Sequence, residues 1–562
     1  MRRQNSPDLP GVRAVHGGNM WPSYWNQPDI PVRFGGDLVA ERSEPVAALR
    51  LHPVWRLALV LLSALLLVLS FEPYALSFLA WVALVPLLVA LPGMSGTGAR
   101  GLAFLFGYAF FAGGVSWLFG IFGAAAVGLI GVLAAFLWLF GLLFWLAEQR
   151  GGAGLALALS PVFWIGIELV RGELWPLRFS WLQLGFSQVP NLPLLQIAGE
   201  IGVYGLGLLI VGANAAVAWV WLRGRWVRGV LATAAVPLLA MGLGLYEVDR
   251  GRWYPTGAPS TFVALIQTDA ASPVRDVAKA QRIPAEVDLI CWPENALHGF
   301  PLEEPELLDD LSLLARESDA ILVIGCKIAA PNGGERLGTK LRARLSAERQ
   351  PADRPYYNSA LVIGPDGTVA GQYHKRHPVQ FFSDGVAGRA VDPITVADRD
   401  LGIAICYDMT FSHVPRQLTQ KGATLLVVPA LDDLPWGPVQ QRQHASMIQA
   451  RAVENRRWVV RATTYGISQA VAPWGFEARS IDRGREGVLW FSTLNIAEAS
   501  GHCRWGWVLP YVCLAGIGVF LLSELIFVWA DRVLGDAPGS LPPGRDAAEA
   551  DGGASIQPRP HE

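Results

Sequence analysis

Long apolar runs dominate the first half of the chain. Residues 54–71 and 75–91 are each long enough to cross the hydrocarbon core of a membrane as a helix. Residues 101–147 carry no charged side chain and are too long for one helix, so the GIFG sequence at 120–123 predicts a turn between two. Four further apolar runs lie at 155–170, 194–222, 227–246 and 505–530. Together with the four helices above, they give about eight expected membrane-spanning helices. One such run alone could be a buried core helix, but that interpretation does not account for so many.

The pattern changes between residues 260 and 498, where short runs rich in Val and Ile are bounded by turn residues. Such runs indicate strands, and they occur at 261–267, 287–292, 320–329, 359–364, 368–373, 401–406, 423–430 and 457–464. Helical patterns lie between them at 304–318 and 438–457, and GPDG at 364–367 predicts a hairpin. Residues 330–355 have the composition of a polar surface insertion. The alternation of mostly buried strands with helices predicts a layered α/β sandwich.

Composition supports a membrane protein. The chain is 52% hydrophobic and only 16% charged, whereas soluble domains carry about a quarter charged residues. The 22 tryptophans suit long membrane–water interfaces. A net charge of −2 indicates no general attraction to nucleic acid. The five cysteines are scattered without CxxC spacing, so the sequence predicts neither a zinc site nor a disulfide framework.

Positive charge orients the predicted spans. Six arginines precede the first span, and the connections after spans two, four and six carry Arg100, Arg150, Arg223 and Arg225. The connections after spans one and three carry no Lys or Arg. The positive-inside rule therefore places both termini in the cytoplasm and the long segment between spans seven and eight outside it. We expect residues 1–50 to form a disordered cytoplasmic tail rather than a signal peptide. Four segments follow: a seven-helix transmembrane domain at 51–247, an extracytoplasmic α/β domain at 258–498, a transmembrane helix at 505–531 and a disordered cytoplasmic tail at 532–562.

Three reactive side chains each follow a predicted strand. Glu294 stands in WPEN, Lys375 in YHK and Cys406 in ICYD. Singly, they are most simply an exposed loop glutamate, a solvated lysine and a buried cysteine. A cysteine thiol is only slightly ionised near neutral pH, so as a nucleophile it needs a base and a group that holds the developing oxyanion. A glutamate, a lysine and a cysteine at the ends of three strands supply those roles if they converge.

In this order, the three motifs resemble the Glu-Lys-Cys triad of the nitrilase, or carbon–nitrogen hydrolase, superfamily. Seven spans, an α/β domain and one closing span further resemble the apolipoprotein N-acyltransferase family. The segments FSWLQLGFSQ at 179–188 and MIQARAVENRRWVVRATTYGISQAV at 447–471 are similar to motifs of that family. The resemblance covers about residues 54–530. It implies a polytopic α-helical membrane protein that carries an extracytoplasmic nitrilase-like αββα sandwich.

The resemblance also implies a function. The family moves a fatty acyl chain from a phospholipid to the α-amino group of the N-terminal diacylglyceryl-cysteine of a lipoprotein, through a thioester in a ping-pong reaction. By resemblance, Glu294 is the general base, Lys375 stabilises the oxyanion and Cys406 is the nucleophile. The expected location is the cytoplasmic (inner) membrane, with the catalytic domain on the periplasmic side. We expect a monomer that needs neither cofactor nor metal.

The sequence departs from the family pattern at three places, one of which is TTYG at 463–466 in place of the usual TNNG. Ser383 stands where the family usually has a glutamate important to activity, and Asp384 follows it. Two residues after Cys406, Asp408 replaces the usual glutamate. Tyr407, Asp408 and Asp384 are therefore expected to be supporting residues. Two alternatives stay open: a membrane-tethered amidase or nitrilase-type hydrolase, and a catalytically inactive scaffold. The Leu- and Trp-containing loop at 431–440, as an apolar lid, favours a lipid substrate.

Four further polar residues, together with Asp408, need an interpretation. Glu168 lies near the end of a predicted span, where we expect its carboxylate to reach the membrane interface. Glu200 has apolar neighbours, and either lines the site or caps a helix inside the bundle. His374 and His377 flank Lys375 without a carboxylate cluster, so surface hydrogen bonding is favoured over metal binding. For Asp408, orienting the site and pairing with a surface cation are equally open.

Overall fold

The computed structural model describes residues 51–251, 259–268, 283–284, 286–297, 299–330 and 354–535. All of these residues belong to one compact unit, Val46–Glu562. The tail expected at 1–50 lies outside the described residues, as do residues 536–562 of the second tail and 331–353 of the polar insertion.

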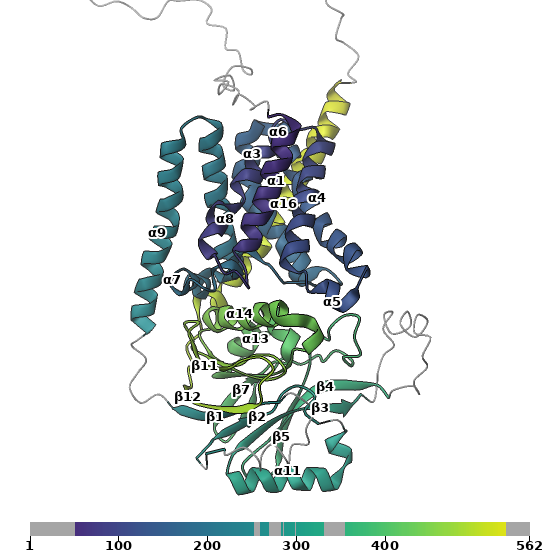
Figure 1. Ribbon diagram of the computed structural model, residues 1–562, viewed down its shortest axis with the longest axis vertical. Coiled ribbons are helices and arrows are strands. Elements are labelled where there is room, and N and C mark those ends of the chain that lie inside the picture. The colour runs from purple at the N-terminus through teal and green to yellow at the C-terminus, as the bar shows by residue number, and fades with distance from the viewer. Residues whose placement is uncertain are drawn as a thin grey trace, which may run out of the picture. The chain divides into compact units, whose positions relative to one another are not determined.

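The apolar runs form helices close to the predicted places (Figure 1). The first run is α1, and the second is divided among η1, α2 and α3. The uncharged run contains α4, the short α5 and the start of α6, so GIFG lies within α5 and its C-cap instead of forming the whole turn. The bounds are α1 (Pro53–Leu69), η1 (Ser77–Leu79), α2 (Ala80–Ala83), α3 (Val85–Ala90), α4 (Gly96–Gly114), α5 (Leu118–Phe122), α6 (Ala125–Leu169), η2 (Val170–Leu174), η3 (Leu184–Gln188), α7 (Leu192–Leu195), α8 (Ala198–Leu222), α9 (Trp226–Gly251) and α16 (Leu509–Gly535).

Glycine interrupts two of these helices. α6 leaves helical geometry at Gly151 (φ −143°) and Gly152 (φ 72°), which divides it between the fourth and fifth predicted spans. α8 is broken at Gly202, where φ is also 72°. A Cβ atom at Gly202 would meet His502 Nδ1 at 2.6 Å, so this position requires glycine for its backbone and for its close packing.

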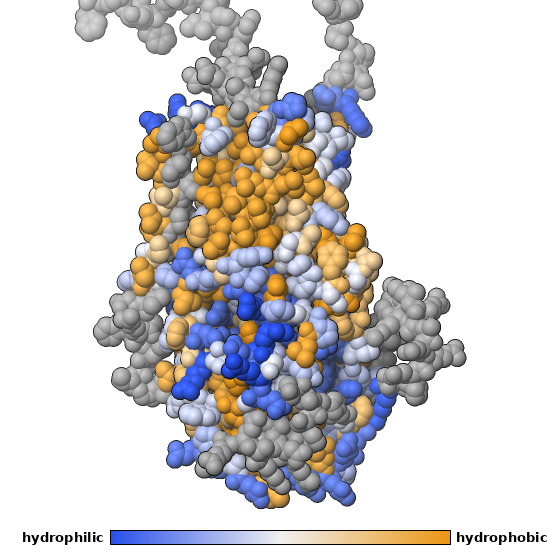
Figure 2. Space-filling model, viewed as in Figure 1, coloured by the Kyte–Doolittle hydropathy of each residue, from blue (hydrophilic) through white to orange (hydrophobic). Residues whose placement is uncertain are grey.

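Several helices have the composition of membrane-spanning segments. Among the described residues, three segments are long and apolar enough to cross a membrane: Ala125–Leu174, Ala198–Leu222 and Gly506–Arg532. Pro53–Leu69 and Ser77–Ala90 are shorter apolar helices. Figure 2 shows a broad apolar surface over the helical part, in contrast to the largely polar surface of the α/β part. Such an exposed apolar surface is typical of contact with lipid.

The α/β part contains two six-stranded sheets. The first has the order β12-β1-β2-β3-β4-β5 and the second β11-β10-β9-β8-β7-β6. The first sheet consists of β12 (Gly487–Leu494), β1 (Ser260–Gln267), β2 (Leu289–Cys291), β3 (Ile321–Ala329), β4 (Tyr356–Ile363) and β5 (Val369–His374). The second consists of β11 (Glu477–Ile481), β10 (Ser468–Val471), β9 (Trp458–Thr464), β8 (Leu425–Leu431), β7 (Arg399–Ile403) and β6 (Ile394–Val396).

Helices cover the outer face of each sheet. α11 (Pro305–Ser318) packs Leu311 against the first sheet. α13 (His413–Gln420) and α14 (Gly437–Asn455) pack Leu418 and Ile448 against the second. Between the sheets lies a third apolar core, which includes Leu265 and Ile403. Three separate cores define four layers, which confirms the predicted αββα sandwich (Figure 1).

The strand predictions hold in position but not in every boundary. All eight predicted strands are present, whereas β6, β10, β11, β12 and α13 were not predicted. β11 has only half-buried and exposed positions, and β12 mixes buried, half-buried and exposed ones, so their sequences lack the apolar runs used to find the others. The strand expected at 401–406 ends at Ile403, and Cys406 instead opens the 3-10 helix η5 (Cys406–Thr410).

Two acidic residues of the bundle differ from expectation. Glu168 is buried and does not reach an interface: its Oε1 accepts hydrogen bonds from Trp164 Nε1 (3.1 Å) and Leu184 N (3.0 Å). Two local donors hold this carboxylate inside the bundle. Glu200 is partly exposed and pairs with Arg456 at the end of α14 (3.1 Å). It therefore joins the bundle to the α/β part, which neither earlier interpretation anticipated.

Helix α14 is the main contact between the bundle and the α/β part. Glu454 Oε1 accepts a hydrogen bond from Val203 N (2.7 Å), next to the break in α8. Gln443 accepts one from Trp117 Nε1 (3.0 Å) and donates to Gly114 O (2.8 Å). These buried bonds fix α14, and hence the loops at the carboxyl ends of the second sheet, against the helices.

Candidate active site

The three predicted triad residues come from both sheets. Glu294 follows β2, Lys375 directly follows β5, and Cys406 follows β7. Because the ends of these strands meet at one edge of the sandwich, the structure brings all three side chains into one buried cluster. Their charges act on one another: Glu294 and Lys375 both influence the ionisation of the Cys406 thiol.

Lys375 lies between two carboxylates. Its Nζ is 2.7 Å from Glu294 Oε1 and 2.7 Å from Asp384 Oδ2. Asn358 Nδ2 donates to both acids, to Glu294 Oε1 (2.6 Å) and to Asp384 Oδ1 (2.5 Å). We call Glu294, Asn358, Lys375 and Asp384 the polar cluster. Burial by itself lowers the pKa of Lys375, but the carboxylates of Asp384 and Glu294 outweigh it and hold that pKa well above its usual range, so the side chain is an ammonium.

Asp384, and not Ser383, therefore supplies the second carboxylate next to the lysine. The backbone carbonyl of Ser383 accepts a hydrogen bond from Tyr356 Oη (2.7 Å), and its side chain is exposed. Asp384 Oδ2 also accepts from Val379 N (2.8 Å), which anchors the segment that follows Lys375. Sequence position alone pointed to Ser383; the folded loop selects its neighbour.

Cys406 stands at a sharp turn. Its φ is 48°, in the left-handed region that non-glycine residues rarely adopt. The Sγ atom is 3.4 Å from Leu431 O at the end of β8. Burial and the Glu294 carboxylate raise the pKa of Cys406 well above its ordinary value, against the opposing effect of Lys375. The resting side chain is therefore a thiol, and attack by sulfur requires a base at the moment of reaction.

Asp408 orients the loops around the site. Its carboxylate accepts hydrogen bonds from Tyr373 Oη (2.9 Å), Arg376 N (3.1 Å) and His377 N (2.7 Å). It thereby ties the turn after Cys406 to the segment after Lys375. These partners are a buried phenol and backbone amides rather than a surface cation, and the role of Asp408 in orienting the site stays a prediction.

The two histidines beside Lys375 make hydrogen bonds to other side chains. His374 Nδ1 is 2.7 Å from Ser359 Oγ, and His377 Nε2 is 2.8 Å from His413 Nε2. His377 and Ser359 are buried and His374 is half-buried, so the expected hydrogen bonds are present but do not lie at the surface.

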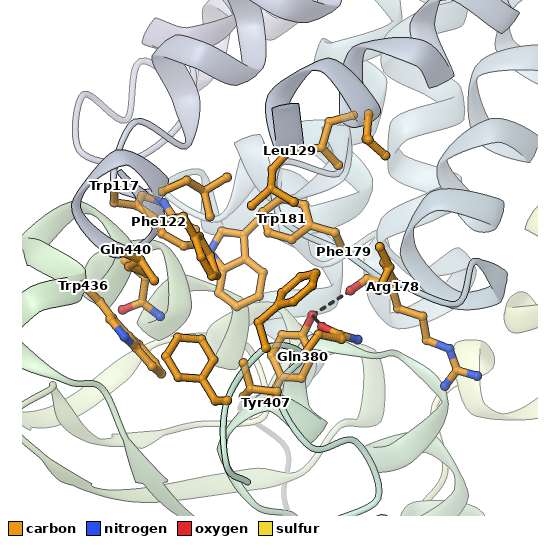
Figure 3. A pocket seen from close by; sticks show the side chains of 18 of the residues that line it. Trp117, Phe122, Leu129, Arg178, Phe179, Trp181, Gln380, Tyr407, Trp436 and Gln440 are labelled. Atoms are coloured by element: carbon orange, nitrogen blue, oxygen red, sulfur yellow. Dashed lines mark hydrogen bonds between the residues drawn. The ribbon is translucent and has the colours of Figure 1, made fainter. Parts of the chain in front are cut away.

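An apolar cavity opens next to the nucleophile (Figure 3). Cys406 and Tyr407 line it together with helices α5 and α6 and the segment 175–181. We call its aromatic and aliphatic lining the apolar wall, represented by Trp117, Phe122, Leu129, Phe179 and Trp181. Tyr407 Oη donates to Arg178 O (2.7 Å) and so links the α/β part to this wall. Trp436, from the predicted lid, also lines the cavity.

Three polar residues of the site were not found from the sequence. Asn358 bridges the two acids of the polar cluster, and Asp432 and His444 form a buried pair beside Cys406. Asn358 could have been found, because it lies on β4 opposite β5 and one residue from the pairing partner of His374. The Asp432–His444 pair gave no signal, because its members come from a loop and a helix.

One cluster has donor atoms close enough for a metal. Single donor atoms of Cys406, Asp432 and His444 lie within 4.8 Å of one another. However, Arg461 Nη2 donates to Asp432 Oδ2, and its fixed positive charge opposes a second cation there. The arrangement fits covalent acyl transfer better, because a thiol, a carboxylate and an ammonium lie buried in one cluster.

Comparison with known proteins identifies two families in the chain. The apolipoprotein N-acyltransferase N-terminal domain matches residues 63–216, and the carbon-nitrogen hydrolase family matches residues 261–495. The apolipoprotein N-acyltransferase of Nitrosomonas europaea is 30% identical over 482 residues, which are 76% of this chain and 88% of that protein. The protein of the same name from Geobacter metallireducens is 29% identical over 517 residues, 82% of this chain and 94% of that protein. Among solved structures, a carbon-nitrogen hydrolase from Helicobacter pylori G27 is similar over 42% of this chain and 88% of that chain, at 17% identity and a TM-score of 0.34.

Proposed function

This chain belongs to the apolipoprotein N-acyltransferase family, and from that premise we propose that it transfers a fatty acyl chain from a membrane phospholipid to the α-amino group of the N-terminal diacylglyceryl-cysteine of a lipoprotein. It is an acyltransferase, as its relatives' shared name and its two family domains indicate. One observation supports a lipid donor above all: Cys406 lies on an apolar cavity lined mainly by the helical bundle.

In the first half-reaction, Glu294 takes the proton of the Cys406 thiol as sulfur attacks the phospholipid ester carbonyl. Lys375 and a backbone N–H near Cys406 hold the oxyanion of the tetrahedral intermediate. The ester C–O bond breaks, Glu294 returns the proton to the departing lysophospholipid oxygen, and a thioester remains on Cys406. The buried ammonium of Lys375 supports this role, because a charge in a dry site stabilises an oxyanion strongly.

Asp384 takes the place of the family's glutamate in this scheme. It shares Lys375 with Glu294, so the ammonium stays fixed when Glu294 becomes a neutral acid during the reaction. Tyr407 and Asp408 position the nucleophile through the hydrogen bonds described above. The departures from the family pattern are therefore compatible with a working enzyme and do not favour the scaffold alternative.

The apolar wall supports a lipid over a water-soluble amide. An acyl chain withdrawn from the bilayer into water loses about 0.8 kcal/mol per CH₂ group. A cavity lined by Trp117, Phe122 and Leu129 removes that penalty while the ester reaches Cys406. A hydrolase would need water held at the thioester, and an apolar lining offers few groups to hold it there.

We further propose that the protein spans the inner membrane with eight helical segments and acts as a monomer. The segments are α1, η1 to α3, α4, the two parts of α6, α8, α9 and α16, which form a transmembrane domain at 51–247 and a closing span at 505–531. The distribution of arginine supports cytoplasmic termini and a catalytic domain, residues 258–498, on the periplasmic side. The apolar surface in Figure 2 supports contact of the bundle with lipid.

The direct test is the acyl adduct. The purified full-length protein is incubated with phospholipid, analysed by intact mass, and then given a diacylated lipopeptide. We expect an acyl adduct on Cys406 that the lipopeptide consumes, and no adduct on Cys406→Ala. If the wild-type protein forms no adduct, both the acyltransferase and the hydrolase functions are overturned. An adduct that water clears but the lipopeptide does not consume overturns the transferase in favour of a hydrolase.

A further inference from the structure

A second set of ionisable side chains lies beside Cys406, outside the polar cluster. His444 of α14 has its Nδ1 atom 2.7 Å from Asp432 Oδ1, just after β8. Arg461 of β9 donates to Asp432 Oδ2, and its Nη2 is 3.1 Å from His444 Nδ1. All three side chains are buried. Burial raises the pKa of Asp432, but Arg461 and His444 outweigh it and keep that pKa below its ordinary value, so Asp432 is a carboxylate.

The second nitrogen of His444 has no hydrogen-bond partner among the described residues. Nε2 is buried, and His444 lines the same cavity as Cys406. In the neutral tautomer that donates its Nδ1 proton to Asp432, Nε2 presents a lone pair. A buried polar atom without a partner costs about 1–3 kcal/mol. A histidine that served only to bridge Asp432 and Arg461 would gain nothing by leaving this atom unpaired at the cavity.

The position next to the nucleophile suggests what the lone pair meets. A ring nitrogen of His444, an oxygen of Asp432 and the Sγ of Cys406 lie within 4.8 Å of one another. An acceptor amine that attacks an acyl group on Sγ must therefore pass close to the imidazole. Near the sulfur, the charged or titratable groups are Cys406, Asp432 and Arg461, with Glu294 and Lys375 acting on Cys406 from the first sheet. Among the described residues, Arg171, Arg178 and Tyr407 also line the cavity.

The second half-reaction needs such a group. An α-amino group has an ordinary pKa of about 7.7–8.0, so near neutral pH most acceptors are ammonium ions that cannot attack a carbonyl. Glu294 already accepts hydrogen bonds from Lys375 and Asn358 and is assigned the proton of Cys406. A separate base is required to generate the free amine at the thioester.

We propose that His444, oriented by Asp432, accepts the first proton of the acceptor's α-ammonium; this inference rests on the proposed function. The free amine then attacks the thioester carbonyl, so that an N–C bond forms and the S–C bond breaks. The second amine proton passes through Glu294 to the Cys406 thiolate and restores the thiol. His444 releases its proton to solvent. The net change converts a thioester and an ammonium into an amide, a thiol and one proton.

The test separates the two half-reactions by rapid quenching and intact mass, with the full-length protein, phospholipid and a diacylated lipopeptide. We expect His444→Gln to form the Cys406 adduct within about twofold of the wild-type rate but to transfer it roughly 5- to 10-fold more slowly near pH 7, because only about 10–17% of an amine with a pKa of about 7.7–8.0 is free there. The transfer rate of the variant should rise about tenfold per pH unit up to the acceptor's own pKa of about 7.7–8.0, whereas the wild-type rate should level off at lower pH. Gln449→Ala, on the same helix but away from the cavity, should leave both rates unchanged.

Normal adduct formation in His444→Gln also shows that the variant is folded with Cys406 in place. Asp432→Asn provides a second variant, which should slow transfer while adduct formation continues. Equal losses in both half-reactions, or a variant with the wild-type pH profile, would overturn the role of His444 and leave the acyltransferase intact. An adduct missing from the wild-type protein would overturn the proposed function, and this inference with it.

Discussion

The polar cluster and the apolar wall face the same sulfur atom but are built in opposite ways. The polar cluster holds an amide, an ammonium and two carboxylates through short, directional contacts between buried groups. The apolar wall is made of aromatic and aliphatic surfaces, several of them partly exposed, that belong to helices and a connecting segment. Directional bonds fix positions to fractions of an ångström, whereas apolar contact depends mainly on area and volume.

This difference predicts two kinds of sensitivity. A change of one charge in the polar cluster leaves its neighbours buried and unpaired, so small substitutions there should have large effects on chemistry or stability. A change in the apolar wall alters how much acyl chain is covered, so its effect should depend on the length of the chain. Substitutions in the two regions therefore test whether the polar cluster responds to charge and the apolar wall to acyl-chain length.

Glu294→Gln should have the largest effect. Loss of the base should slow formation of the Cys406 adduct by about 10²–10⁴-fold. The same variant should react faster with iodoacetamide near pH 7, because the Glu294 carboxylate raises the pKa of Cys406 and its removal lowers that pKa. Adduct formation and alkylation are followed by mass spectrometry between pH 6 and 9.

The surface variant Glu303→Gln serves as the matched control and should change neither rate. Its carboxylate pairs with Arg354 at an exposed site. If alkylation and acylation of Glu294→Gln fall together, Glu294 is needed for structure rather than as a base.

Lys375→Met should destabilise the protein by about 3–5 kcal/mol, because two carboxylates are left buried without their cation. The double variant Lys375→Met/Asp384→Asn should recover part of this loss. Because the folded pKa of Lys375 is raised, its contribution is fully present below the ordinary lysine pKa and is lost only as pH rises through the raised value. The deficit should therefore stay constant from pH 7 to 9 in thermal unfolding measurements.

Lys421→Met is the matched control, since Lys421 pairs with Asp392 on the surface. Exposed ion pairs contribute about 0–1 kcal/mol. If Lys375→Met loses no more stability than Lys421→Met, the polar cluster tolerates unpaired buried charges, and its proposed sensitivity to single charge changes is wrong.

Leu129→Trp should slow the reaction to an extent that depends on the length of the donor's acyl chain. The indole of the new tryptophan would fill space in the cavity that Leu129 and Phe122 line. Overpacking of this kind costs about 1–3 kcal/mol. Adduct formation from phospholipids with long acyl chains should fall about tenfold or more, while donors with short chains should react at nearly the wild-type rate.

Val127→Trp, on the exposed face of α6 and outside the cavity, should leave both donors unaffected. Equal losses with long and short chains would show that the apolar wall does not hold the acyl chain.

Tyr407→Phe should have the smallest effect, although this residue joins the two regions. It loses the hydrogen bond to Arg178 O, which is worth about 0.5–1.5 kcal/mol. Adduct formation should slow by about tenfold or less. Tyr74→Phe, an exposed ring, is the control. A loss as large as that of Glu294→Gln would place the Tyr407 hydroxyl among the reacting groups.

Much of this architecture could be predicted because its signals are local. The apolar runs located the bundle helices, and the period and composition of the strands located eight of the twelve. The strands that were not found, such as β11 and β12, consist largely of half-buried and exposed positions and therefore lack a clear apolar run. Glu294, Lys375 and Cys406 could be selected because each follows a strand and matches a known motif.

By itself, then, the sequence determined the helices, most strands and the three candidate reacting residues, because backbone preference and hydrophobic periodicity act over a few neighbouring positions. Only the tertiary structure decided which acid accompanies Lys375, what Asp408 holds, where Glu168 lies, and that Asp432 and His444 stand beside Cys406. Those relations join positions up to 38 residues apart, from Cys406 to His444. They depend on distance and burial in three dimensions, which decide whether two charges pair, and neither quantity is carried by the order of residues along the chain.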